Sequence, residues 1–254
     1  MFAPRLALAS LSGESDAVWA RSAESHAGAA FLGGIAIDES SRRAARRMAE
    51  RDRDEFLPDD PLAFIERELG ALDDAPLRAG VNVRSGSRAP IREVAEICRE
   101  NDAMLELNAH CRQDELCAVG CGETLLRDAH RLCEQVETAA DTGATVSVKV
   151  RAEVPGVSLA DTARWIEAAG AELIHVDAMD SEPVIRDVAD ATELFVIANN
   201  GVRDGETAQE YLEYGADAVS IGRPSDRPAI LQRVREAVDD WFETETEPAA
   251  GAGR

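Results

Sequence analysis

The sequence has very little lysine, few aromatic residues and no long apolar run. Only one of its 27 basic residues is a lysine, and aromatic residues make up 4% of the 254-residue chain. No apolar run approaches the roughly 18 residues that a membrane-spanning helix needs, which argues against a membrane protein. The first residues contain no cationic leader or cleavage site, so we expect no signal peptide. Five cysteines are an odd count for a disulfide framework and fit a reducing cytoplasm better.

Acidic residues outnumber basic ones by 49 to 27, which gives a formal net charge of −22 at pH 7. Together with arginine in place of lysine and with small apolar side chains, this composition suggests a halophilic protein from a very salty cytoplasm. At 1 M salt the Debye length falls to about 3 Å, so the net charge says little about partners. We therefore interpret the acidic stretches as a solvated surface. A hydrophobic content of 45% excludes a disordered chain.

Eight short runs of small and β-branched residues alternate with longer amphipathic stretches. The runs lack the period-2 polarity of half-exposed strands, as expected for strands buried on both faces. The predicted strands are Leu6–Ala9, Ala30–Ile37, Leu77–Val83, Ala103–Leu107, Thr145–Val150, Leu173–Val176, Leu194–Ala198 and Ala216–Ile221. The predicted helices are Pro61–Leu69, Ile91–Glu100, Glu123–Ala140, Leu159–Ala169, Glu182–Ala189, Glu206–Tyr214 and Pro228–Phe242. This alternation predicts an α/β protein with a single (β/α)8 TIM barrel; the open doubly wound sheet, which competes with it, needs fewer units.

Two segments fall outside the alternation. The charged segment Asp38–Asp60 is predicted to form an exposed helix and a loop after the second strand. Residues 244–254 are rich in Glu, Thr, Pro, Ala and Gly, so we expect a disordered acidic tail after a barrel of residues 1–243. Ser158 and Asp204 stand where helix N-caps belong.

Polar and small residues gather at the predicted C-terminal ends of the strands, where barrels of this type carry their chemistry. These ends are Ser10–Gly13, Asn82–Arg84, Asn108–Cys111, Lys149–Arg151, Asp177–Asp180, Asn199–Val202 and Gly222–Pro224. We expect the functional site among them.

Lys149, the only lysine, lies on the fifth predicted strand. A composition so biased toward arginine is expected to keep lysine where a compact ammonium is needed and a planar guanidinium does not serve. On a buried strand this ammonium needs an anionic partner or it loses its charge. The alternative is that Lys149 has no functional role and simply pairs with a carboxylate in the core.

The loops after the seventh and eighth strands form a candidate phosphate site. They contain Asn199-Asn200-Gly201 and Gly222-Arg223. In this fold these loops commonly bind phosphate through main-chain N–H groups and a helix N-terminus, and Arg223 adds a fork of donors. The alternative is that these are ordinary turn glycines.

Cys111 follows the fourth predicted strand, and Cys117 and Cys121 lie nearby. The spacings, with His110 as a fourth ligand, match no regular zinc or iron–sulfur pattern. A loop thiol over the barrel mouth is instead suited to donate a proton, because its usual pKa is about 8.5. We expect Cys98 and Cys133 to be buried small residues on helix faces, and His175, inside a strand, to be a hydrogen-bonded core histidine.

These strand ends resemble those of the flavin-dependent tRNA-dihydrouridine synthases, and more broadly the FMN-binding barrels that include dihydroorotate and dihydropyrimidine dehydrogenases. The segment from Ala9 to Asp16 resembles the first flavin loop, A-P-M-A-G-x-T-D, and Val81-Asn82-Val83 stands where the family has V-Q-L. The remaining matches are Leu107–Cys111 with L-N-x-G-C, Gly120–Leu126 with the segment that follows it, Val148–Arg151 with V-K-x-R, and Ala198–Val202 and Gly215–Arg223 with the two phosphate segments. Together with the composition, the resemblance suggests a divergent member of haloarchaeal type.

The resemblance implies an FMN cofactor, with NADPH or NADH as the electron donor. It assigns Lys149 to the negative charge of the reduced flavin, and Cys111 to the protonation of one carbon of a pyrimidine double bond while hydride from flavin N5 reaches the other. The implied cofactor-binding residues are Ser10, Leu11, Ser12, Asn82, Asn108, Lys149, Asn199, Asn200, Gly201, Gly222 and Arg223. No metal is implied.

Several positions depart from the family pattern. Asn82 replaces a glutamine, His110 replaces the glycine before the cysteine, and Arg112 replaces a proline. Where strand 6 of the synthases ends in H-x-R, this chain has Asp177, Ala178 and Met179, which removes two cations from the substrate side. The resemblance therefore supports flavin binding more firmly than a tRNA substrate.

The sequence thus predicts a cytoplasmic FMN-dependent oxidoreductase that acts on a C=C bond of a uracil-like ring, either in tRNA or in a free small molecule such as a dihydropyrimidine. Other open hypotheses are a flavin-free phosphate-binding lyase or isomerase that uses Lys149, and a non-catalytic binding module. Six arginines from Arg42 to Arg53 form a local basic cluster, which we interpret as a salt-bridged surface helix rather than an RNA-binding stripe. The sequence does not give the oligomeric state.

Overall fold

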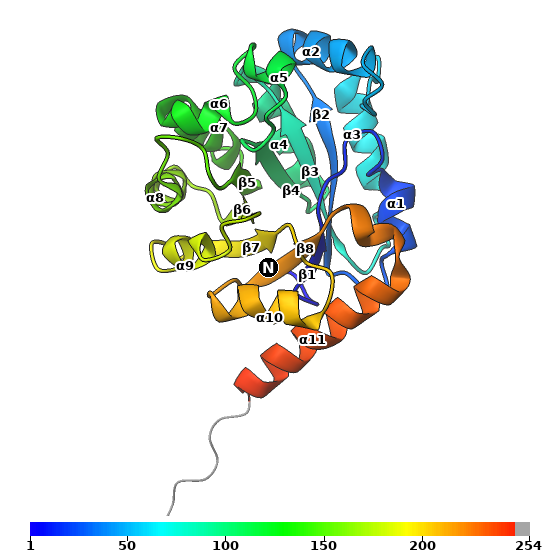
Figure 1. Cartoon of the computed structure of the whole chain (residues 1–254). Helices are drawn as coiled ribbons and strands as arrows, with labels where there is room; N and C mark the ends of the chain where they lie inside the picture. The colour runs from blue at the N-terminus through cyan, green and yellow to red at the C-terminus, as the bar shows by residue number, and fades with distance from the viewer. Residues whose placement is uncertain (247–254) are drawn as a thin grey trace, which may run out of the picture.

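Eight parallel strands close into a barrel in the computed structural model, which describes residues 1–246 (Figure 1). The strands are β1 (Leu6–Leu8), β2 (Ala29–Ala36), β3 (Arg78–Arg84), β4 (Met104–Asn108), β5 (Thr145–Arg151), β6 (Leu173–Asp177), β7 (Phe195–Asn199) and β8 (Ala218–Ile221). Each strand pairs with its neighbours in the sequence, and β8 pairs with β1 to close the sheet. The predicted (β/α)8 barrel is confirmed, because runs without period-2 polarity are what strands buried on both faces require.

Helices surround the barrel on its outer face (Figure 1). They are α1 (Ala17–Ser22), α2 (Glu39–Ala49), α3 (Pro61–Gly70), α4 (Ala89–Glu100), α5 (Asp114–Cys117), α6 (Thr124–Arg127), α7 (Ala129–Ala140), α8 (Leu159–Ala168), α9 (Val184–Ala189), α10 (Gly205–Glu213) and α11 (Pro228–Thr246). The prediction of one helix over Glu123–Ala140 was wrong, because the chain breaks at Asp128. The Asp128 carboxylate accepts a hydrogen bond from the backbone N–H of Arg131 and begins α7 anew.

The two predicted N-caps are confirmed. The Ser158 hydroxyl accepts from the backbone N–H of Asp161 at the start of α8, and Asp204 accepts from the N–H of Thr207 at the start of α10. Each side chain satisfies a backbone donor that the first helical turn leaves free.

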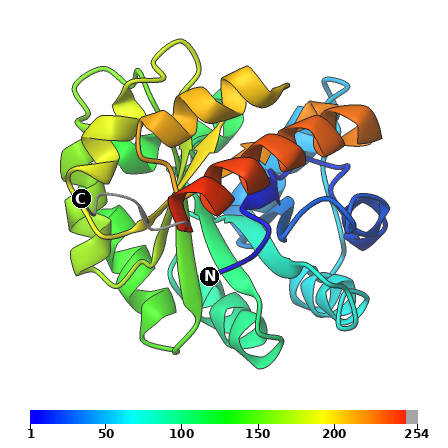
Figure 2. The ribbon, with the colours of Figure 1, turned by 90° about the horizontal axis from the view of Figure 1, so that it is seen from below.

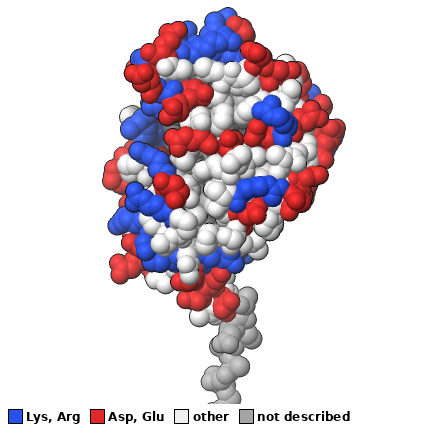
Figure 3. Space-filling model, turned by 90° about the vertical axis from the view of Figure 1, so that its right-hand side faces the viewer, with Lys and Arg blue, Asp and Glu red and all other residues white. Residues whose placement is uncertain are grey.

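The charged segment after β2 forms α2 and an exposed loop, as predicted. Arg43 pairs with Glu39 at 3.0 Å on the same helix, and Arg51 pairs with Glu115 at 2.7 Å. Figure 3 shows basic side chains interspersed with acidic ones over this face of the molecule. These contacts agree with a salt-bridged surface helix, whose exposed ion pairs each contribute about 0–1 kcal/mol.

Helix α11 runs to Thr246, beyond the predicted domain boundary at residue 243. It lies alongside α10 in the view from below (Figure 2). The rest of the predicted tail, residues 247–254, lies outside the described residues. Among residues 1–246, no helix combines the length and the apolar character that crossing a membrane would need.

A layer of apolar side chains fills one end of the barrel interior. Its fully buried members are Ala7, Ala29, Phe31, Met104, Leu173, Ile197 and Ala218. The Phe31 ring is the largest of them, and it fits because its partner in the β2–β3 register is Gly80. A Cβ atom at Gly80 would come within 2.6 Å of that ring.

Replacing Gly80 with alanine should therefore overpack this layer. We expect Gly80→Ala to lower the free energy of unfolding by about 1–3 kcal/mol, measured by urea denaturation. The matched control is Gly70→Ala in α3, where a Cβ meets nothing within 4 Å. Because alanine favours a helix over glycine by about 1 kcal/mol, this control should be neutral or stabilising. Equal effects of the two variants would contradict the packing argument.

Candidate active site at the carboxyl ends of the strands

A cavity of about 660 Å³ opens at the carboxyl ends of the strands. Nine of the predicted site residues line it: Ser10, Leu11, Ser12, Lys149, Asn199, Asn200, Gly201, Gly222 and Arg223. They come from the loops after β1, β7 and β8 and from β5, so segments far apart in the sequence share one space. The strand order brings them together, since parallel strands of a barrel all end at the same face.

Three predicted site residues do not line this cavity: Asn82, Asn108 and Cys111. Asn82 is fully buried; its amide donates to Glu106 at 2.7 Å, and its oxygen accepts from Asn108 at 2.9 Å. The Asn108 oxygen in turn accepts from the backbone N–H of Cys111 at 3.0 Å. The contacts predicted for these residues with a ligand stay predictions.

Cys111 packs beside the cavity against an apolar cluster of Ala44, Met48, Leu116 and Cys121. Burial raises the pKa of the Cys121 thiol to about 12, so this thiol stays neutral and packs as an apolar group. Cys98 is fully buried, as predicted, and burial raises its pKa to about 12 as well. Within residues 1–246, no group of three or more His, Cys, Asp or Glu side chains is arranged to hold a metal ion.

Lys149 reaches the cavity as a buried cation without a partner. Only 2% of the residue is exposed, yet it lines the cavity and makes no hydrogen bond or ion pair with any residue that the structure describes. Burial lowers the pKa of its ammonium, and the negative charges of Glu106 and Asp177 oppose that shift. A buried ammonium of this kind favours an anionic group in the cavity.

Glu106 is the carboxylate that the sequence analysis missed. It is fully buried within β4, and its Oε2 lies 2.7 Å from Nδ1 of His175. Burial opposes ionisation, but the charges of His175 and Lys149 and the hydrogen bonds outweigh it and lower the pKa of Glu106. One signal was available: Glu106 interrupts the apolar run Met104–Leu107, and a buried Lys149 requires a carboxylate nearby.

The strand register explains why Glu106, Lys149 and His175 lie close together. Glu106 pairs with Ser147 on β5, two residues before Lys149, so Ser147 and Lys149 point to the same face. Lys149 pairs with His175 on β6. The other ring nitrogen of His175 lies 2.7 Å from the Ser220 hydroxyl, so both nitrogens have partners, and the prediction of a hydrogen-bonded core histidine is confirmed.

A second titratable pair, His110 and Asp177, lines the cavity directly. His110 Nε2 lies 3.2 Å from Asp177 Oδ2, and Asp177 Oδ1 accepts from the Asn200 amide at 2.9 Å. Burial opposes ionisation of Asp177, but His110 and Asn200 outweigh it and lower its pKa. Burial also lowers the pKa of His110, although Asp177 acts in the opposite direction. Sequence reasoning placed both residues at strand ends, weighed His110 as a metal ligand and noted both as departures from the family pattern, but it did not predict that they pair.

The loops after β7 and β8 present glycine backbone and arginine side chains to the cavity. Asn200 and Gly201 have left-handed backbones, with φ of +83° and +73°, and a Cβ at Gly201 would meet nothing within 4 Å. Arg223 makes no hydrogen bond or ion pair with the described residues. Asp204 caps α10, whereas the four-residue 3₁₀ helix η1 (Arg223–Asp226) after β8 begins at Gly222 without a side-chain cap. An anion here would rely on the turn and the arginines.

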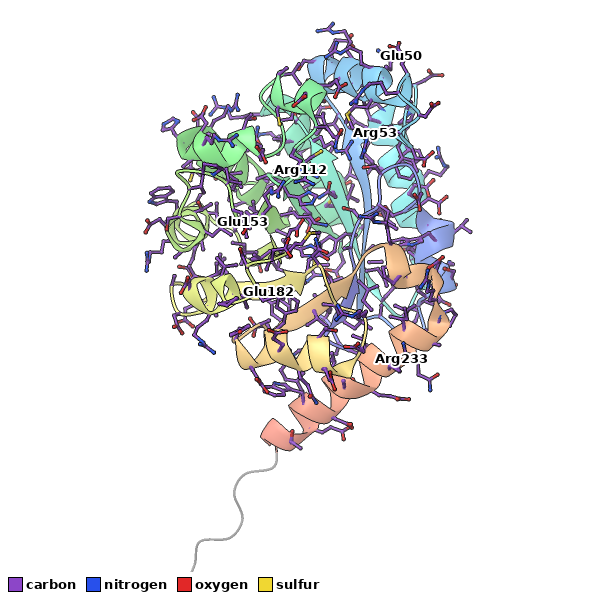
Figure 4. All side chains as sticks on the ribbon, viewed as in Figure 1. Glu50, Arg53, Arg112, Glu153, Glu182 and Arg233 are labelled. Carbon is purple, nitrogen blue, oxygen red and sulfur yellow. The ribbon has the colours of Figure 1, made fainter. Side chains whose placement is uncertain are left out.

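Residues 52–54, which sequence analysis did not place in the site, form another wall of the cavity. Glu55 anchors them through a buried ion pair with Arg84 at 2.5 Å, and Arg84 also donates to the Ser12 hydroxyl. Gly13 permits the close approach: its φ is +74°, and a Cβ there would lie 2.6 Å from the Glu55 backbone. Arg53, one of these residues, is labelled in Figure 4. Nothing in the local sequence pattern indicates such a long-range contact.

Comparison with known proteins identifies the family. The family model for dihydrouridine synthase matches residues 71–251. The chain belongs to the dihydrouridine synthase family. Dihydrouridine synthases are FMN-dependent oxidoreductases. An uncharacterized protein of Methanocaldococcus jannaschii is 24% identical to this family member over 231 residues, which cover 86% of this chain and 88% of that protein.

Solved structures show the fold of this dihydrouridine synthase family member in other proteins. A FabK mutant of Thermotoga maritima has a TM-score of 0.58 and 14% identity, and the match covers 87% of this chain but only 62% of the FabK chain. A chain of the tryptophan synthase complex of Pyrococcus furiosus has a TM-score of 0.58 at 13% identity, over 96% of this chain and 97% of that one. At these identities the likeness extends to the barrel alone.

Glu106→Gln tests the buried network of this synthase family member. It keeps the side-chain volume but removes the charge that faces His175 and Lys149, so we expect a loss of about 3–5 kcal/mol in unfolding free energy at pH 7. Because the folded-state pKa of Glu106 is lowered, its contribution is present above the ordinary value of 4.5 and is lost as pH falls through the folded pKa. The difference in unfolding free energy between wild type and variant, measured by urea titration, should therefore become smaller as pH falls.

The control for this comparison is Glu96→Gln, an exposed position on α4. It should unfold like the wild type at every pH. If the difference in unfolding free energy between wild type and Glu106→Gln stays constant down to strongly acidic pH, this would contradict the assigned charge of Glu106.

Proposed function

We propose that this protein is an FMN-dependent oxidoreductase that acts on a C=C bond of a uracil-like ring. The observation that carries the proposal is Lys149, an ammonium that is buried, unpartnered and at the wall of a large cavity. A reduced flavin ring carries negative charge, and a fixed cation in a water-poor site stabilises such charge strongly. Membership of the dihydrouridine synthase family supports the same cofactor.

The chemical groups that line the cavity are suited to bind FMN. Lys149 would hold the polar edge of the flavin ring, and the loop Ser10–Ser12 would lie against it. The glycine backbones of Gly201 and Gly222, with the free guanidinium of Arg223, would hold the phosphate. Bound FMN supplies hydride at its N5 atom, and NADPH or NADH would supply the electrons.

Cys111 is the proton donor that the family resemblance implies. Its side chain packs beside the cavity rather than at its wall, so a role as the acid requires the loop after β4 to turn the thiol toward the substrate. The Asn108 side chain holds the backbone of this loop through the N–H of Cys111. The substrate ring is either a uridine in tRNA or a free pyrimidine.

Flavin content tests the proposal first. Protein purified in concentrated salt should show a flavin spectrum and release FMN on denaturation, or take FMN up when it is titrated. We expect Lys149→Met to weaken FMN binding by about 10- to 100-fold, because a charged hydrogen bond of about 1.5–3 kcal/mol is lost. The matched control is Arg151→Met, a cation two residues further along β5 that does not line the cavity.

A colourless protein that takes up no FMN would overturn the proposal. The lowered pKa of Lys149 favours one alternative in that case, a lyase or isomerase in which a neutral lysine amine attacks a carbonyl. Covalent trapping of Lys149 by borohydride with a carbonyl substrate would then support this alternative.

The substrate is tested with two probes, tRNA from a strain that lacks the gene and free uracil or uridine. Unchanged dihydrouridine in the tRNA of that strain, together with turnover of a free pyrimidine, identifies a small-molecule enzyme. Cys111→Ala should then retain FMN but slow re-oxidation by the active probe about 100-fold or more, the size of a general-acid contribution. Equal turnover would remove Cys111 as the acid.

A further inference from the structure

Two partly exposed thiols lie next to each other in the loop after β4. All five cysteines are free, and the Cys117 thiol lies 3.7 Å from the carbonyl oxygen of Cys111, which accepts its weak hydrogen bond. Cys111 and Cys117 are only partly buried, whereas Cys121 is 0% exposed and packs in the apolar cluster beside them. The residue proposed above as the proton donor therefore has a second accessible thiol as its neighbour.

The path of the loop brings these two residues together. Cys117 ends the single turn of α5, and the chain then returns to Cys111, whose carbonyl oxygen accepts from the backbone N–H of Glu123 at 2.8 Å. Gly122 allows this return, because its φ is +63° and a Cβ there would lie 2.0 Å from the Cys111 oxygen. One carbonyl group thus holds both the Cys117 thiol and the end of the loop.

Little structure resists a closer approach of the two sulfur atoms. Helix α5 has four residues, and no side chain caps its start at Gln113. A thiol is a weak hydrogen-bond donor, so the contact between Cys117 and the Cys111 carbonyl is easily exchanged for another. Disulfides join cysteines whose Cα atoms are about 4.4–6.8 Å apart. A thiol that already contacts the backbone of the other cysteine can meet that requirement when the side chains turn toward each other.

We propose that Cys111 and Cys117 form a reversible disulfide that removes the proton donor from the site. The inference rests on the proposed function, which assigns the proton to Cys111. Where a disulfide forms in a reducing cytoplasm, it is usually transient and either catalytic or redox-sensing. Neither residue lines the cavity, so the bond is expected to leave the flavin site intact.

A hydroperoxide is the oxidant. One thiolate attacks a peroxide oxygen, the O–O bond breaks, and the sulfur becomes a sulfenic acid while the rest of the peroxide leaves as water or an alcohol. The second thiol then attacks this sulfur, so that the S–S bond forms and the hydroxyl group leaves with a proton as water. The two sulfurs lose two electrons, which the peroxide gains. A small-molecule thiol in excess returns both cysteines to the reduced state by exchange.

The cross-link is tested on the full chain with hydrogen peroxide in concentrated salt. After free thiols are blocked with N-ethylmaleimide, trypsin cuts after Arg112 and Arg127 and so separates Cys111 from Cys117. We expect mass spectrometry to find residues 100–112 and 113–127 linked in chains that run as monomers on a non-reducing denaturing gel, and dithiothreitol to separate them. A Cys111 that stays free, or that is oxidised only to sulfinic acid, overturns the proposal whether or not the protein binds FMN.

Two variants identify the partner of Cys111. Cys117→Ser should lose the cross-link, although Cys121 remains on the same tryptic peptide. Cys133→Ser is the matched control, a partly exposed cysteine on α7, and it should form the cross-link like the wild type. A cross-link that persists in Cys117→Ser would assign the bond to Cys121 and overturn the proposed pair.

The effect on the site is tested by two half-reactions after the peroxide has been removed. In the cross-linked protein, FMN content and flavin reduction by NADPH or NADH should be unchanged. Re-oxidation by the active probe identified above should be slowed about 100-fold, the size of a general-acid contribution, and dithiothreitol should restore it. Cys117→Ser should keep the untreated rate and show no loss that dithiothreitol reverses.

The outcomes separate this inference from the proposed function. Normal re-oxidation by the cross-linked protein overturns the inference and leaves the proposed function standing. Absence of FMN overturns the proposed function, and the mass measurement still decides whether Cys111 and Cys117 form the pair.

Discussion

The site depends on a carboxylate buried inside the barrel. Glu106 is fully buried, contacts His175 and accepts a hydrogen bond from the Asn82 amide, and the positive charge of Lys149 further lowers its pKa. Without this charge an ammonium that is 2% exposed would lose its proton or leave the interior. The carboxylate is committed to its interior partners, whereas the ammonium has none of its own. The barrel thus compensates part of the cation's charge and leaves its hydrogen-bonding capacity for a ligand.

Different walls of the cavity carry different charged groups. The loops after β7 and β8 supply arginine and glycine backbone, while β4 and β6 supply His110 and Asp177. Residues 52–54 close one wall, and the buried Glu55–Arg84 pair holds them against the loop after β1. Arginine and glycine backbone thus lie at one part of the cavity, and the His110–Asp177 pair lies at another.

Two departures from the dihydrouridine synthase pattern are coupled in space. His110 stands where the resemblance has glycine, and Asp177 stands where it has the first residue of H-x-R. In the fold these two side chains contact each other across the mouth. The Asp177 carboxylate thus holds the imidazole of His110, which lies two residues after β4.

The architecture was accessible from the sequence because it depends on short-range periodicity. Buried parallel strands show as uninterrupted apolar runs, and their C-terminal ends collect polar residues, so Lys149 and the loops after β7 and β8 could be placed together. Local signals failed where a single side chain competes with the helical pattern. Asp128 breaks one amphipathic stretch into α6 and α7, and α11 continues through residues that composition alone would assign to a tail.

The sequence by itself determined the barrel, the mouth of the barrel as the site, and the lone lysine within it. Only the tertiary structure decided the partners: Glu106 with His175, His110 with Asp177, Arg84 with Glu55, and the position of Cys111 beside the cavity rather than at its wall. The physical reason is that strand identity follows from neighbouring residues, whereas these contacts depend on the register between strands and on the path of the loops. Both are set by the closure of the whole barrel, and neither leaves a pattern along the chain.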